Sequence, residues 1–181
     1  DTYTRLIMNI FTVDLNPVTA AKSLCDKHIT KMSVETTQML VSALRRHGAT
    51  DSELPLTKAG TPHKGGYAHH PCTVWAGDTK HNFYWLLAHG FGLVAEYTHR
   101  YGKQHACKDQ LWHISSLNGR RNIIPKGDLT DVALAVGGHR PQDLTHAPLD
   151  VAVEFYRQFY CADKKAFAKW DKDPSRQPNW W

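Results

Sequence analysis

The segment LCDKHITKMSVETTQML, residues 24–40, lies in the longest stretch of the chain that can form helix without interruption. Upstream of it, Asn16 can cap a helix and Pro17 can occupy the first helical position, where its missing N–H costs nothing. No further Gly or Pro follows until Gly48, which is a fit C-terminal stop. The pattern predicts one long helix, or two helices broken near Asp26.

The rest of the chain divides by the positions of its Gly and Pro residues. Seven of them punctuate residues 48–72, so we expect a long loop there, which in a compact domain is often functional. Apolar spacings of three and four predict helices over about 73–100 and 150–170. Residues 102–148 are mixed, with a short helix expected at 112–117.

Composition agrees with one compact domain. The chain is 41% hydrophobic and 22% charged, which excludes disordered and collagen-like classes. No apolar run approaches the roughly 18 residues of a membrane span, and no signal peptide is apparent. We therefore expect an all-α, single-domain bundle over residues 1–181, with about three main helices, a long irregular loop and an irregular middle region.

Net charge and cysteine content bear on the class of partner and on the cellular compartment. Lys and Arg number 22 against 17 Asp and Glu, a net charge of +5. Such a balance suits a nucleic-acid partner or merely a basic soluble enzyme, and charge alone leaves both open. Four cysteines without a CxxC pair indicate reduced thiols in a cytosolic protein.

Three polar residues of the opening segment share one helix face. His28, Lys31 and Glu35 are separated by three and four residues. A carboxylate among apolar groups, with an amine and an imidazole beside it, suits a general acid or base. A surface ion pair between Lys31 and Glu35 explains the same spacing, and helix geometry alone favours that ordinary pair.

The segment HKGGYAHHPC, residues 63–72, combines flexible glycines with Tyr67, His69 and His70. These side chains offer stacking and hydrogen-bonding edges for nucleic acid. Adjacent histidines followed by Cys72 do not match a zinc ligand spacing, so no metal site is predicted.

Other candidate DNA contacts are the basic residues of the predicted helices and loops. They are Lys27, Lys31, Arg45, Arg46, Arg120 and Arg121. Cations near helix C-termini are also what the helix dipole favours, so spacing alone does not assign them to phosphates. Trp180 near the C-terminus can stack on a base or close the hydrophobic core.

Several of these motifs together resemble the pyrimidine-dimer DNA glycosylase family, which includes phage endonuclease V. DKHITKMSVE, residues 26–35, is similar to the family's first helix, with the same spacing between its histidine and its catalytic glutamate. GYAHHP, residues 66–71, resembles a loop of bacterial members. The helical stretch 71–102 and the ending QPNWW, 177–181, are also similar, above all to short phage-encoded members. The resemblance covers most of residues 8–181.

The resemblance implies an all-α enzyme that excises a damaged pyrimidine from double-stranded DNA and then cleaves the abasic strand. It assigns Glu35 as the catalytic carboxylate and the α-amine of the processed N-terminus as the nucleophile that forms an imine. It implies no cofactor or metal, a monomer, and a location in the cytosol of a bacterium or a phage-infected host. His28 would orient Glu35 or contact a phosphate.

The chain departs from the family pattern at two places. Val34 and Gln38 stand where the phage enzyme has arginines. Seven residues, 1–7, precede Met8, where the family's chains begin, and we interpret them as an N-terminal extension. Lys31, one turn from Glu35, is then a substitute nucleophile. These departures leave two alternatives: an enzyme of the same fold that transfers a group to a modified pyrimidine, or a non-catalytic DNA-binding relative.

Overall fold

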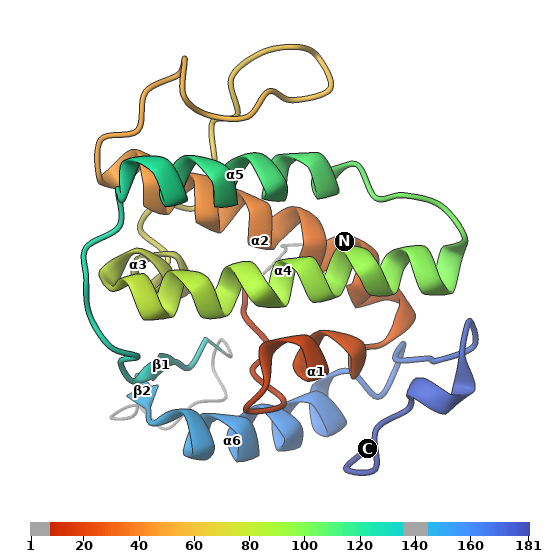
Figure 1. Cartoon of the computed structure of the whole chain (residues 1–181). Helices are drawn as coiled ribbons and strands as arrows, with labels where there is room; N and C mark the ends of the chain where they lie inside the picture. Colours follow the sequence, from red (N-terminus) through yellow and green to blue (C-terminus); the bar gives the residue numbers. More distant parts are fainter. Residues whose placement is uncertain (1–7, 136–144) are drawn as a thin grey trace.

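The computed structural model describes residues 8–135 and 145–181, and within them the fold is mostly helical (Figure 1). Six α-helices occur in this part of the chain: α1 Pro17–Lys22, α2 Asp26–Arg46, α3 Pro71–Asp78, α4 Lys80–Tyr101, α5 Cys107–Arg121 and α6 Leu149–Asp163. The short strands β1 (Val132–Ala133) and β2 (His146–Ala147) pair antiparallel, with Val132 opposite Ala147. A 3-10 turn, η2 Pro174–Arg176, precedes the C-terminus. The predicted all-α class is confirmed.

Local chemistry explains where the helices begin and end. Of the two predicted alternatives, the break near Asp26 is present and the single long helix is not: the Asp26 backbone N–H donates to the Lys169 carbonyl at 2.8 Å rather than continuing α1. The Asn16 side chain caps α1, as expected, and α2 ends at Arg46, before Gly48 with a φ of 97°.

Three helix boundaries differ from the sequence prediction. The helix expected over 73–100 is divided at Thr79, whose backbone is extended and whose side-chain hydroxyl caps α4 by accepting from the Asn82 N–H. The helix expected at 112–117 extends over all of α5. The last helix ends at Asp163 and not at 170, so the chain after it folds back along the domain. At these three places tertiary packing, and not the local spacing of apolar residues, determines where the helix begins or ends.

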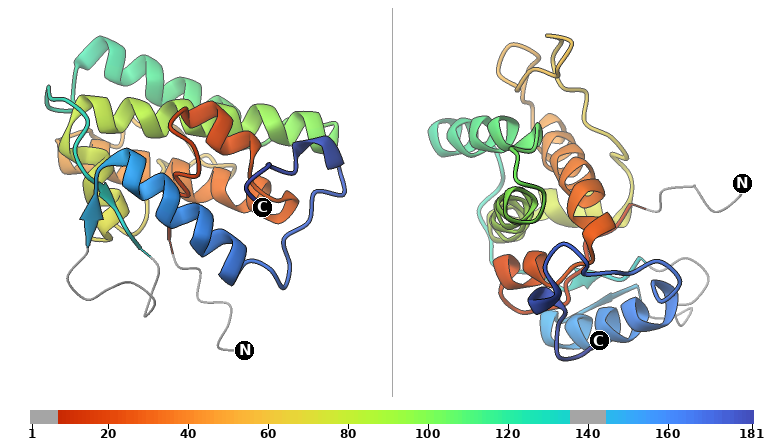
Figure 2. Two further views of the ribbon diagram at one scale, coloured as in Figure 1. Left: turned by 90° about the horizontal axis from the view of Figure 1, so that it is seen from below. Right: turned by 90° about the vertical axis from the view of Figure 1, so that its right-hand side faces the viewer.

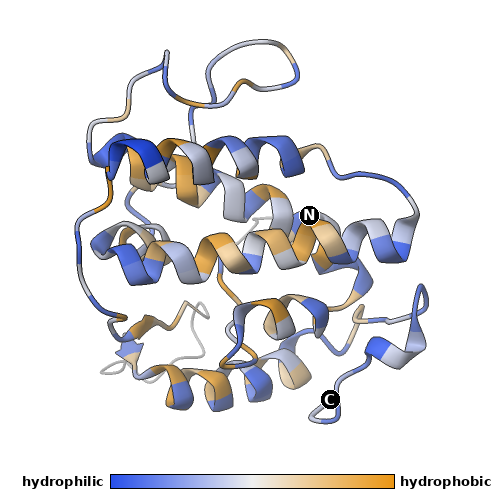
Figure 3. Cartoon of the chain, in the orientation of Figure 1, coloured by the Kyte–Doolittle hydropathy of each residue, from blue (hydrophilic) through white to orange (hydrophobic). Residues whose placement is uncertain are grey.

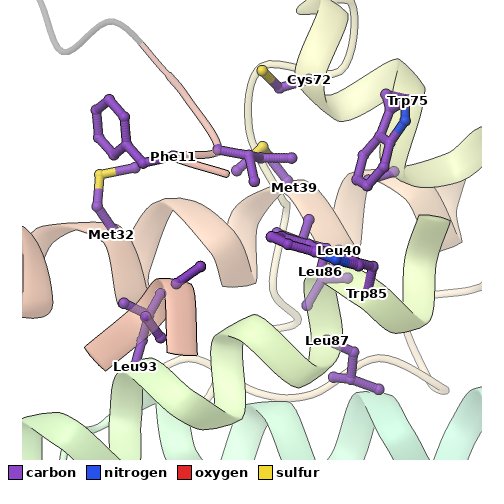
Figure 4. Packing of buried hydrophobic residues seen from close by; sticks show 14 of the residues in the cluster. Phe11, Met32, Met39, Leu40, Cys72, Trp75, Trp85, Leu86, Leu87 and Leu93 are labelled. Carbon is purple, nitrogen blue, oxygen red and sulfur yellow. The ribbon is translucent and has the colours of Figure 1, made fainter. Parts of the chain in front are cut away.

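α4 is the central helix and packs against α1, α2, α3 and α5. The approach to α1 is so close that a Cβ on Gly92 would lie 2.9 Å from the Ala21 methyl group. Figure 3 shows the apolar faces of these helices turned inward. In Figure 4, Trp75 of α3 and Trp85 of α4 lie near each other in this core, and their rings meet edge to face at 6.3 Å.

α6 covers one side of the domain, and much of the loop after α2 projects from the opposite side (Figure 2). Residues 8–13 are buried between them, and the Asn9 side chain accepts a 2.8 Å hydrogen bond from the Tyr156 hydroxyl of α6. None of the helices in the described ranges is long and apolar enough to cross a membrane. The N-terminal extension expected at residues 1–7 lies outside the residues that the structure describes.

Candidate active site

Glu35 lies in the middle of α2 and is 4% exposed. Neither of its carboxylate oxygens has a hydrogen-bond partner among the described residues. Burial raises the pKa of Glu35 to about 7, although the nearby charges of Lys31 and Lys164 act to lower it. The surface ion pair with Lys31, which helix geometry alone favours, is absent: the carboxyl is buried and makes no ion pair within 4 Å in the described parts of the chain.

Segments distant in sequence surround this carboxyl group. Complete burial of the Cys72 thiol at the start of α3, with a smaller contribution from the charge of Glu35, raises the pKa of Cys72 to about 12. Cys72 Sγ in turn lies 3.8 Å from Asn9 Oδ1. Glu35 thus faces the junction of α2, α3 and the buried segment that begins at Met8.

Lys164, directly after α6, is the residue of this site that sequence reasoning missed. Its ammonium nitrogen lies over the rings of an aromatic cluster, at 5.6 Å from Phe11, 5.0 Å from Phe159 and 6.0 Å from Phe167. Its charge acts on Glu35 and on His28. No local signal in the sequence connects this lysine with α2, because only the packing of α6 brings it there.

His28 is buried and bonded to α6 rather than to Glu35. Its Nδ1 lies 2.9 Å from the Tyr160 hydroxyl, and its ring stacks on Phe11 at 4.8 Å. Burial, followed by the charges of Lys164, Lys31 and Lys27, lowers the pKa of His28 to about 3. His28 is a neutral imidazole at physiological pH, and the expected hydrogen bond that would orient Glu35 is absent from the described residues.

The loop before α3 is fixed against α2 one and two turns beyond Glu35. The Ser42 hydroxyl accepts from the Gly66 N–H at 2.8 Å and donates to the Gly66 carbonyl at 2.9 Å. A Cβ on Gly65, whose φ is 75°, would lie 2.4 Å from Ser42 Oγ, so the close approach requires glycine. Tyr67 follows with a φ of 53° and is 50% exposed. An exposed aromatic ring is thereby held beside α2.

The two loop histidines have different surroundings. His69 is exposed, whereas His70 is half-buried and its Nδ1 accepts from the Cys72 N–H at 3.1 Å, which caps α3. Burial lowers the pKa of His70. No cluster of three His, Cys, Asp or Glu side chains suited to a metal ion occurs in residues 8–135 and 145–181.

Most of the arginines expected to contact DNA make intramolecular bonds. Arg45 binds Asp51 at 2.7 Å and also donates to the His63 carbonyl, which closes the base of the loop. Arg46 pairs with Asp78 at 3.0 Å. Arg121 pairs with Glu53, while Arg120 is exposed. These contacts hold the loop and α3 in place.

Lys27 and Trp180 lie on the side of the domain that contains α6. Lys27, in the first turn of α2, is exposed and its ammonium nitrogen lies 4.8 Å from the Phe167 ring centre. Trp180 is partly buried, edge to face with Tyr160 at 5.8 Å and beneath the Arg157 guanidinium. Trp180 thus packs against α6 and remains partly exposed.

Comparison with known proteins identifies a family for this chain. A family model described as pyrimidine dimer DNA glycosylase matches residues 8–109, more than half of the chain. Searches of the curated proteins and of the solved structures find no match. The matched segment contains α2 with Glu35, the loop with Tyr67, and the central helix α4. The chain therefore belongs to the pyrimidine dimer DNA glycosylase family.

Proposed function

We propose that the protein excises damaged pyrimidines from double-stranded DNA, with Glu35 as the catalytic carboxyl group, and then cleaves the abasic strand through an imine. The observation that carries the proposal is the unpaired, buried carboxyl of Glu35. An orphaned buried carboxyl is costly to a fold, and such groups concentrate at functional sites.

The acidity of Glu35 suits proton transfer. With a pKa of about 7, the carboxylic acid and the carboxylate are both well populated at neutral pH. The acid can protonate the departing pyrimidine, and the carboxylate can stabilise the positive charge that develops on the sugar. Neither role needs a group that the chain does not itself supply.

Charge near Glu35 supports a DNA substrate. Lys27, Lys31 and Lys164 all act on His28, so three ammonium groups gather on this side of α2. They can neutralise phosphates around an extruded nucleotide, while the exposed Tyr67 ring can stack on a base. Arg45 and Arg46 already form ion pairs within the protein. Their assignment to phosphates remains a prediction, as do the DNA contacts of His69, His70, Arg120, Arg121 and Trp180.

The proposal is tested with a duplex that contains one cyclobutane pyrimidine dimer. Glu35→Gln should reduce excision by at least about 100-fold, the usual contribution of a positioned acid or base, and should still bind the duplex. Glu154→Gln, which alters an exposed carboxyl on α6, is the control and should excise normally.

Nucleoside mass spectrometry of the treated DNA separates the alternatives. A released base or an abasic site supports excision. A heavier nucleoside would instead support group transfer to the pyrimidine. Unaltered DNA with tight, salt-dependent binding would indicate a DNA-binding relative without catalysis. Either of the last two results would refute the proposed function.

A further inference from the structure

Gln38 is a half-buried residue of α2 whose side-chain amide makes no hydrogen bond to another described residue. It follows Glu35 by three positions and Val34 by four, so both residues are its neighbours on the helix surface. A primary amide has two N–H donors and one carbonyl acceptor. This unbonded amide, next to the candidate catalytic carboxyl, is therefore available to a substrate.

The loop before α3 holds the amide in place. A Cβ on Gly66 would lie 3.4 Å from Gln38 Cδ and 3.6 Å from Gln38 Oε1, so the amide packs against the Gly66 backbone. Gly66 is itself fixed by its two hydrogen bonds to the Ser42 hydroxyl. The residue after Gly66 is Tyr67, which is 50% exposed. An exposed aromatic ring thus directly follows the glycine that packs against the amide.

The charge of α2 changes along its solvent-facing side. Lys27 and Lys31 lie in its first two turns. Val34, which is 43% exposed, and Gln38 follow as a neutral stretch, and the next cation, Arg45, already forms an ion pair. Cations neutralise phosphates, whereas a neutral amide reads the donors and acceptors of a base edge. The lysines therefore suit phosphates, and the neutral stretch suits a base.

The edge of a thymine is complementary to a primary amide. O4 of the base accepts a hydrogen bond and the adjacent N3–H donates one, so a glutamine amide can form both bonds at once. A cyclobutane dimer joins C5 and C6 and leaves O4 and N3–H unchanged. In the duplex these atoms pair with adenine, and they become free once the nucleotide leaves the stack. Such an amide therefore recognises an extruded thymine and not a paired one.

We propose that Gln38 is a specificity-determining residue, which reads the O4 and N3–H edge of the extruded pyrimidine while Tyr67 stacks on its face. This inference rests on the proposed function and deepens it, since it names the group that selects the base beside Glu35. The lysines of the site then contribute affinity for DNA of any sequence, and Gln38 contributes the choice of base.

Excision kinetics with two substrates test the contact. One duplex carries an ordinary thymine dimer, and the other carries a dimer in which C–H replaces N3–H, which removes the donor without adding bulk. Gln38→Met keeps the length of the side chain and its packing against Gly66 but forms neither hydrogen bond. In the unaltered protein the loss of N3–H should lower kcat/KM by about 10- to 100-fold. Gln38→Met should excise the ordinary dimer at least as slowly, and the loss of N3–H should then have little further effect.

Two further variants complete the experiment. Gln38→Asn retains the amide but withdraws it by one methylene group, so it should lose the same preference for the ordinary dimer. Gln158→Met, at an exposed position of α6, is the matched control and should discriminate between the two dimers as the unaltered protein does. Urea unfolding of each variant confirms that the fold is retained. All of them should bind undamaged duplex as tightly as the unaltered protein, because no base is extruded there.

The outcomes separate this inference from the proposed function. If Gln38→Met slows by the same factor as the unaltered protein when N3–H is absent, the amide does not contact that atom. The assignment of Gln38 is then overturned while the glycosylase function stands. An equal loss of affinity for damaged and undamaged duplex would also overturn it, since it would assign Gln38 to the DNA backbone. Absence of excision by the unaltered protein would refute the function itself, and this inference with it.

Discussion

The Nδ1 atom of His28 lies 2.9 Å from the hydroxyl oxygen of Tyr160, and this contact joins the first turn of α2 to α6. The same hydroxyl accepts a 2.9 Å hydrogen bond from the backbone N–H of Cys25. α6 lies beyond the segment that matches the family model, yet the residue four positions after Tyr160 is Lys164. Tyr160 therefore joins the end of α6, just before Lys164, to the start of α2.

Tyr160→Phe should destabilise the fold. The change removes one hydroxyl and leaves two buried polar groups, Cys25 N–H and His28 Nδ1, without their partner. Each such loss costs about 1–3 kcal/mol, so we expect a decrease of about 2 kcal/mol or more in the free energy of unfolding by urea. Tyr97→Phe is the control, since the Tyr97 hydroxyl makes no hydrogen bond to another described residue. Equal stability of the two variants would contradict this role of Tyr160.

Glu35→Gln should stabilise the protein at alkaline pH. The pKa of Glu35 is about 7 in the folded protein and 4.5 ordinarily, so the folded state favours the protonated carboxyl. As the pH rises from 4.5 through 7, the cost of the buried carboxylate lowers the free energy of unfolding. The penalty is absent below about pH 4.5 and fully present above pH 8. We expect a gain of about 2 kcal/mol at pH 8, discounted for the screening lysines, and little gain at pH 4.5. Urea unfolding at both pH values measures it, and a gain independent of pH would contradict this account.

Mild acid should destabilise the protein through its buried histidines. Burial lowers the pKa of His28 to about 3 and that of His89 to about 4, from 6.5. Below pH 6.5 these histidines are protonated in the unfolded chain but remain neutral in the folded chain. The free energy of unfolding therefore decreases as the pH falls below 6.5. Glu35 acts in the opposite direction but is a single group. We expect the melting temperature to fall between pH 7 and pH 4.5, and less steeply in His89→Gln.

Tyr67→Gly should improve stability and weaken function. A tyrosine with a φ of 53° carries strain that glycine does not, so the variant should gain about 1 kcal/mol in unfolding free energy. Loss of an exposed ring that stacks on a base should reduce binding to damaged duplex by about 1–3 kcal/mol. Thermal unfolding and fluorescence anisotropy give the two values. A variant that bound the duplex normally would exclude Tyr67 from the interface.

Lys27→Ala and Arg45→Ala should affect DNA binding differently. Lys27 is exposed beside the candidate site, so its removal should reduce the slope of log K against log salt by about 1. Arg45 is bound to Asp51 and to the His63 carbonyl, so its removal should speed proteolysis within the loop and leave the slope unchanged. A lower slope of log K against log salt for Arg45→Ala would show that Arg45 contacts a phosphate.

The sequence by itself determined the helical class and the loop after α2, and it offered a break near Asp26 as one of two alternatives. Glu35 was singled out by the family resemblance, not by its spacing. The helical class, the loop and the break depend on local chemistry: a capping Asn16, glycines at turns, and an unbroken apolar pattern. The same local information misjudged the ends of α5 and α6, because packing against α4 and the return of the tail outweigh propensity at helix ends.

Only the tertiary structure decided what surrounds Glu35. Spacing on α2 offered His28 and Lys31 as its partners, yet His28 bonds to Tyr160 and Lys31 makes no ion pair with the carboxyl. Lys164 comes from the end of α6, and no periodicity relates it to α2. Burial, which sets the acidity of both groups, depends on side chains contributed from across the chain, so the chemistry of this site exists only once α6 has packed against α2.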